Sequence, residues 1–82
     1  MVEFTVSDDS LTKTSTDYVR LRFNPSGLDK VTKLKMLAAA FITECEYMQA
    51  DREKEVGREC AVAITNMQTA SMWAVSAATK GL

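Results

Sequence analysis

The feature that most constrains this chain is an uncharged segment of 20 residues, from Cys60 to Thr79, in a sequence of only 82. The segment is rich in small residues, and its apolar residues recur at helical spacing. On a helix, one stripe joins Val56, Cys60, Ala63, Met67, Ala70 and Ala74, and Ile64, Met72 and Val75 widen the apolar arc beyond half of the circumference. A single partner helix cannot cover so wide an arc. The segment therefore predicts a helix whose packing is completed by copies of the same chain.

A second long helix is predicted upstream, from residue 27 or 28 to about residue 49. Pro25 disfavours a helical conformation in the residue before it, and Ser26 with Asp29 resembles a capping box. Apolar residues then follow at spacings of three and four, namely Val31, Leu34, Ala38, Phe41, Cys45 and Met48. This spacing predicts a seam that packs against an antiparallel helix or against a helix of another copy of the chain.

The segment between the two helices contains no proline, so its boundaries are predicted from capping alone. We expect a turn near residues 49–52, with Asp51 as the N-cap of a last helix that continues to about Thr79 and includes Gly57. At about 1.5 Å per residue this helix is roughly 40 Å long. The predicted fold is mainly α: two long antiparallel helices form a helical hairpin over residues 28–82, completed by homo-oligomerisation.

Residues 1–27 are predicted to form an N-terminal arm, either extended or in short strands. Val2, Phe4 and Val6 alternate with polar residues, as do Val19, Leu21 and Phe23, which is typical of strands. The polar residues 7–17 between these runs predict a loop.

The composition argues against catalysis and against a metal site. The sequence contains no histidine, and it has neither a phosphate-loop glycine pattern nor zinc-ligand spacing. We therefore predict no enzyme activity, no cofactor and no metal. Cys45 and Cys60 lie on apolar stripes and are expected as buried thiols, with a disulfide across the hairpin as the alternative. Because the chain has neither an apolar run of membrane-spanning length nor a signal-peptide pattern, we expect a cytoplasmic protein.

The charges are segregated although the net charge is only −1. Residues 12–36 carry a net charge of +4, and such a local patch suits a compact anion such as phosphate better than long nucleic acid. A solvated basic face without a ligand is the alternative. Lys35 lies on the flank of the predicted seam, where its stem can cover apolar surface while its ammonium reaches a cleft. Tyr18 precedes Arg20 and Arg22, so it can stack a base while the cations hold its phosphate, or it can act only as a surface anchor.

The stretch from Arg58 to Ala77, and the run from Leu28 to Lys35 followed by Ala38, resemble a known family. Together they are similar to the last and middle helices of the phage anti-CBASS cyclic-oligonucleotide sponges, over roughly residues 28–78. The resemblance implies a small helical protein that assembles as a hexamer from interlocked dimers. It also implies that cyclic di- or trinucleotide signals of bacterial defence are sequestered in the host cytosol, without cleavage, in pockets between protomers.

The resemblance also assigns three candidate ligand-binding residues. Lys35 matches a phosphate-binding lysine of the dinucleotide pocket, and Arg58 matches an arginine of a separate trinucleotide site. Tyr18 stands near a base-stacking tyrosine, across a gap in the match. Glu59 and Leu37 depart from the family pattern at the trinucleotide site.

Two other functions remain open from the sequence. The acidic segment at residues 44–59 and the methionines suit an oligomeric adaptor that binds a host protein. A strand carrying Arg20 and Arg22 before two helices has the order of a ribbon-helix-helix DNA-binding regulator, although the predicted helices are about twice too long for one.

Overall fold

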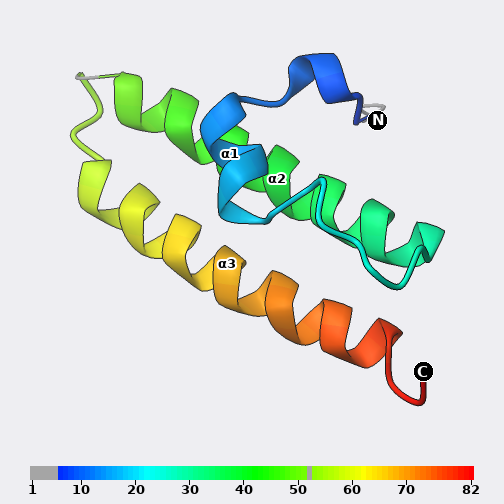
Figure 1. Ribbon diagram of the computed structural model, residues 1–82. Coiled ribbons are helices and arrows are strands. Elements are labelled where there is room, and N and C mark those ends of the chain that lie inside the picture. Colours follow the sequence, from blue (N-terminus) through cyan, green and yellow to red (C-terminus); the bar gives the residue numbers. More distant parts are fainter. Residues whose placement is uncertain (1–5, 52) are drawn as a thin grey trace, which may run out of the picture.

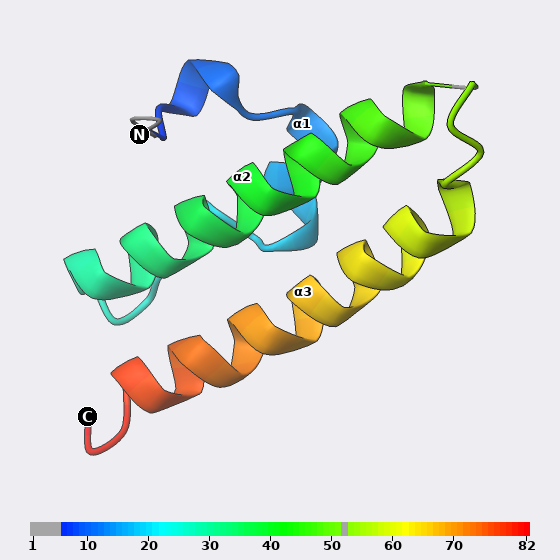
Figure 2. The same cartoon turned by 180° about the vertical axis from the view of Figure 1, so that it is seen from behind.

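The structure, a computed structural model, describes residues 6–51 and 53–82 of the chain. Its elements are a 3₁₀ turn, η1 (Asp8–Ser10), and three α-helices: α1 (Lys13–Tyr18), α2 (Asp29–Ala50) and α3 (Gly57–Ala78). Helices α2 and α3 pack side by side and antiparallel, and α1 packs on α2 (Figures 1 and 2). The described ranges contain no strand. The prediction of a mainly helical fold built on a hairpin is confirmed.

Helix α2 starts where the sequence predicts, although the capping box does not form. Its N-cap is Leu28, and no side chain caps the helix. The hydroxyl of Ser26 instead accepts a hydrogen bond from the Leu28 N–H at 3.2 Å and donates one to the Asn24 side chain at 2.7 Å. Gly27 has a φ of 68°, which glycine adopts at little cost. The segment before α2 is therefore a turn that is held by side-chain hydrogen bonds and leads directly into the helix.

The polar segment that was expected to be a loop contains helix α1. The Thr12 hydroxyl caps this helix by accepting from the Ser15 N–H at 3.1 Å. The Thr43 hydroxyl of α2 donates to the Ser15 hydroxyl at 2.8 Å and accepts from the Thr12 N–H at 3.1 Å. The Glu46 carboxylate accepts hydrogen bonds from the Thr12 and Thr14 hydroxyls. Tertiary hydrogen bonds to α2 therefore give this polar sequence its structure.

The prediction of a strand at residues 19–23 is wrong, because these residues form turns that end α1. The alternation reflects burial, since Val19 and Leu21 are each 5% exposed while Arg20 and Arg22 are exposed. The ribbon-helix-helix alternative loses the strand on which it depended. The other predicted strand, at residues 2–6, lies almost entirely outside the described residues.

Helix α3 begins later than predicted. Asp51 is the C-cap of α2 and not the N-cap of α3, and its side chain accepts from the Glu53 N–H at 3.1 Å. Glu55 has a φ of 51°, a left-handed conformation that interrupts a helix, and Gly57 is the first residue of α3. With 22 residues, α3 is about 33 Å long, and not 40 Å.

The core lies between α2, α3 and the turn after α1, which contributes Val19 and Leu21. Ala39 and Ile42 are fully buried in it, and Val31, Ala38 and Cys45 of the predicted seam are buried as well. Phe41 and Met48 of the same seam are 45% and 43% exposed, so the single chain leaves much of their surface uncovered. Because α2 packs against both α1 and α3, its buried face is rotated from the predicted seam toward Ala39 and Ile42.

The two cysteines are free and buried, as expected. Both belong to the core cluster between α2 and α3. Burial, and to a smaller degree the nearby Cys60, raises the pKa of the Cys45 thiol. A thiol in these surroundings acts as a small apolar residue and not as a nucleophile.

Helix α3 leaves several large apolar side chains exposed. Met72 and Trp73 are 72% and 73% exposed, and Val62 is 50% exposed. Of these three residues, only Met72 belongs to the predicted apolar arc, and its exposure shows that the α2–α3 hairpin alone does not cover the whole arc. Among the helices that the structure describes, none is both long and apolar enough to cross a membrane.

Candidate functional site

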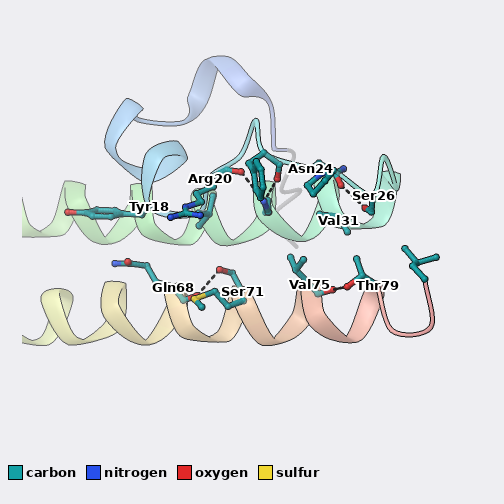
Figure 3. Close-up of a pocket in the computed structure, with 15 residues that line it drawn as sticks. Tyr18, Arg20, Asn24, Ser26, Val31, Gln68, Ser71, Val75 and Thr79 are labelled. Carbon is teal, nitrogen blue, oxygen red and sulfur yellow. Dashed lines mark hydrogen bonds between the residues drawn. The ribbon is translucent and has the colours of Figure 1, made fainter.

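The candidate site is a pocket of about 840 Å³ that lies between the chain after α1, the first half of α2 and the second half of α3 (Figure 3). It is lined by Tyr18, Val19, Arg20, Phe23, Asn24, Pro25, Ser26, Val31, Lys35, Gln68, Ser71, Met72, Val75, Thr79 and Leu82. This volume falls within the range of roughly 300–1,000 Å³ that is typical of small-molecule sites. Within residues 6–51 and 53–82, the lining contains two cationic side chains and no aspartate or glutamate side chain.

Lys35 is the buried cation of this pocket. It is 8% exposed, and its ammonium donates hydrogen bonds to the carbonyl oxygens of Arg20, at 2.9 Å, and of Phe23. The ammonium also lies 5.6 Å from the centre of the Phe23 ring. Burial, and then the charge of Arg20, lowers the pKa of Lys35 from its usual 10.5. The two carbonyl acceptors favour the charged form, which is the form that binds anions.

Tyr18 lies in the same pocket. It is the last residue of α1, and its ring is half exposed. Figure 3 shows Tyr18 and Arg20 on one side of the pocket, with Gln68, Ser71 and Val75 across from them on α3. The structure therefore brings together two of the three predicted site residues, an aromatic ring and a lysine.

Arg58 lies elsewhere. It is the second residue of α3, it is exposed, and it does not line the pocket. Ser71, which does line the pocket, follows Arg58 by 13 residues, a separation of about 20 Å along the helix axis. Any site that contains Arg58 is thus separate from the pocket within one chain.

From the sequence, Arg20 is considered only together with Arg22, as cations that can hold a phosphate beside Tyr18, and Gln68 is not singled out. Arg20 stood beside Arg22 in the basic block, and nothing in their spacing separates the two. Gln68 lies in the uncharged segment, where neighbouring amides and hydroxyls give no signal of their own. Only the fold shows that both line the same pocket as Lys35.

Within the described residues, no three cysteine, aspartate or glutamate side chains are grouped so that they could hold a metal ion. The polar side chains of the pocket are instead cations, amides and hydroxyls, all of which can donate hydrogen bonds to a ligand. This arrangement resembles a binding site for an anion with an aromatic portion.

A family model described as "Acb2/Tad1, hairpin domain" matches residues 14–79. The chain belongs to the Acb2/Tad1 family. This is the family of anti-CBASS cyclic-oligonucleotide sponges, so the resemblance seen in the sequence is confirmed. No curated protein and no solved structure gives a significant match to the chain.

The Acb2/Tad1 match extends beyond the two long helices. It begins at Thr14, within α1, and ends at Thr79, the C-cap of α3. The matched region therefore includes Tyr18 and the turn after it, together with the hairpin. Membership implies sequestration of cyclic oligonucleotides, since this is a family of binding proteins.

Proposed function

We propose that this protein sequesters cyclic di- or trinucleotide second messengers of bacterial defence, without cleaving them, and that it acts in the host cytosol during phage infection. The observation that carries the proposal is the pocket that holds Tyr18 and Lys35 in a chain of the Acb2/Tad1 family. An aromatic ring can stack on a base, and a lysine with a free N–H can bind a phosphate. A nucleotide contains both a base and a phosphate, and the two groups that suit them line one pocket.

The ligand pocket is proposed to be completed by a second protomer. Tyr18, Phe23 and Met72 line the pocket but remain 49%, 59% and 72% exposed. A neighbouring chain packed over this face would bury these side chains and enclose a ligand. The exposed Trp73 next to Met72 is the type of residue that anchors such an interface. A homo-oligomer, and a hexamer in particular, is the proposed assembly.

Arg58 is proposed to act in a separate site for cyclic trinucleotides. Its exposure at the start of α3 and its distance from the pocket agree with a second site formed between chains. A planar, permanently charged guanidinium suits a phosphate at such an interface.

The experiment that tests the proposed function is thermal unfolding with a panel of cyclic di- and trinucleotides. A ligand at a hundred times its dissociation constant stabilises the folded state by about 2.7 kcal/mol. For a small domain this raises the melting temperature by several degrees. Linear dinucleotides of the same bases serve as controls. A melting temperature that no cyclic nucleotide changes would refute the proposal and leave the protein-binding adaptor as the better one.

A further inference from the structure

The two arginines that follow Tyr18 are equivalent in the sequence but differ in the structure. Arg22 donates from Nη1 to the Asp8 carboxylate at 3.1 Å, and its side chain is 78% exposed. Arg20 lines the pocket, and it forms no ion pair within the described residues. Of these two guanidinium groups, the pocket therefore contains the one that forms no ion pair with a described carboxylate.

The backbone at Arg20 adopts a conformation that arginine rarely takes. The Leu21 N–H donates to the Thr16 carbonyl at 3.0 Å and the Arg20 N–H to the Asp17 carbonyl at 3.2 Å, which together form a Schellman motif at the end of α1. Arg20 occupies the left-handed position of this motif, with a φ of 52°, where glycine is preferred. Strained non-glycine residues of this kind concentrate at functional sites. The position thus favours a role for the Arg20 side chain.

Lys35 alone is a poor site for a phosphate. An ammonium has three N–H donors, and two of them are directed to the carbonyl oxygens of Arg20 and Phe23. One donor remains for a ligand, whereas a phosphate group offers several acceptor oxygens. A guanidinium can add two parallel donors to the same phosphate.

We propose that Arg20 is a second anion-binding residue of the pocket, which holds a phosphate group jointly with Lys35. The turn that positions Arg20 also supplies the carbonyls that fix the Lys35 ammonium, so one short segment orients both cations. Among the described residues, no aspartate or glutamate side chain lines the pocket. The two cations therefore repel each other without a neutralising carboxylate from these residues, and an anion bound between them would relieve that repulsion. The inference rests on the proposed function for the identity of the full ligand, but not for the phosphate group itself.

The test is an NMR titration of backbone amide signals with inorganic pyrophosphate at constant ionic strength. It compares the wild type with Arg20→Gln, which removes the charge, and with Arg22→Gln as a control that removes the same charge two residues away. Arg20→Asn is the second variant, because asparagine tolerates a positive φ and should preserve the turn. Wild type and Arg22→Gln should show saturable shifts at pocket residues such as Tyr18 and Gln68. Both Arg20 variants should bind roughly tenfold to hundredfold more weakly.

Equal affinity in the Arg20 variants and in Arg22→Gln would overturn the inference, and so would the absence of pocket shifts in the wild type. Repeating the titration with the cyclic nucleotide panel separates the two proposals. Pyrophosphate binding that depends on Arg20, without any response to cyclic nucleotides, would leave the phosphate site in place and refute the sponge function. Cyclic nucleotide binding that is unchanged in Arg20→Gln and Arg20→Asn would support the sponge function and refute the role of Arg20 in the phosphate site.

Discussion

Replacing Lys35 separates its structural role from its proposed role in binding. Lys35→Met retains most of the buried stem but removes the ammonium and its hydrogen bonds to the carbonyls of Arg20 and Phe23. A hydrogen bond to a charged group contributes about 1.5–3 kcal/mol, but removing a buried charge also removes its desolvation cost. We therefore expect Lys35→Met to be destabilised by no more than about 2 kcal/mol.

Lys35→Ala provides an internal check on this reasoning. It removes three further methylene groups of a side chain that is 8% exposed, at about 0.8 kcal/mol for each buried methylene. The alanine variant should thus be about 2 kcal/mol less stable than the methionine variant. Urea unfolding at one fixed protein concentration measures both values, because assembly would make stability depend on concentration.

The binding arm of the experiment uses calorimetry with the cyclic nucleotide that gives the largest thermal shift. Lys35→Met should remain folded and bind roughly tenfold to hundredfold more weakly, the loss of one charge-assisted hydrogen bond. Lys33→Met is the matched control, since Lys33 lies on the same helix, is exposed and does not line the pocket. Wild-type affinity in a folded Lys35→Met variant would refute the assignment of Lys35 to the ligand.

Four further outcomes are expected. Trp73→Glu should shift the oligomer toward smaller species in light scattering at unchanged helix content, because this 73% exposed side chain is proposed to lie at an interface; an unchanged mass would contradict it. Ile42→Ala should cost about 2–5 kcal/mol in urea unfolding, whereas Phe41→Ala should cost less than about 1.5 kcal/mol in the isolated chain, since Ile42 is fully buried and Phe41 is 45% exposed. Arg20→Gly should stabilise the fold by up to about 1 kcal/mol by relieving a φ of 52° while it weakens anion binding; lower stability would argue against strain there. Anion affinity should fall as the pH rises through the pKa of Lys35, because only the charged ammonium binds phosphate. Since this pKa is lowered, the fall should begin at a lower pH than for an exposed lysine, and Lys35→Arg should abolish it.

The start of α2 could be predicted from the sequence because nearby residues determine it, whereas the start of α3 could not. Pro25 and the glycine that follows fix where the chain enters α2, so its start was placed within two residues. The start of α3 was missed by about five residues, because Asp51 has the chemistry of an N-cap but serves as the C-cap of α2. The helix cannot begin earlier because Glu55 adopts a left-handed conformation, which a glutamate in the sequence does not indicate.

The site could be predicted only in part. Lys35 and Tyr18 were selected from the resemblance and from their residue types, and the fold places both in one pocket. The acceptors of Lys35 lie 12 and 15 residues earlier in the chain, at Phe23 and Arg20, in a segment that was expected to be extended. Helical periodicity carries no information about such contacts. For the same reason the sequence could not distinguish Arg20 from Arg22.

The turn after α1 thus links the position of α1 to the chemistry of the pocket. Thr43 of α2 holds α1 by hydrogen bonds to Thr12 and Ser15, and α1 ends in the Schellman turn that presents Arg20. The carbonyls of the same turn hold the Lys35 ammonium on α2. Since each cation depends on one docked segment, displacing α1 would move Arg20 and release Lys35 together. The polar N-terminal segment is in this sense a part of the binding site, and the family match that begins at Thr14 includes most of α1 and the whole turn.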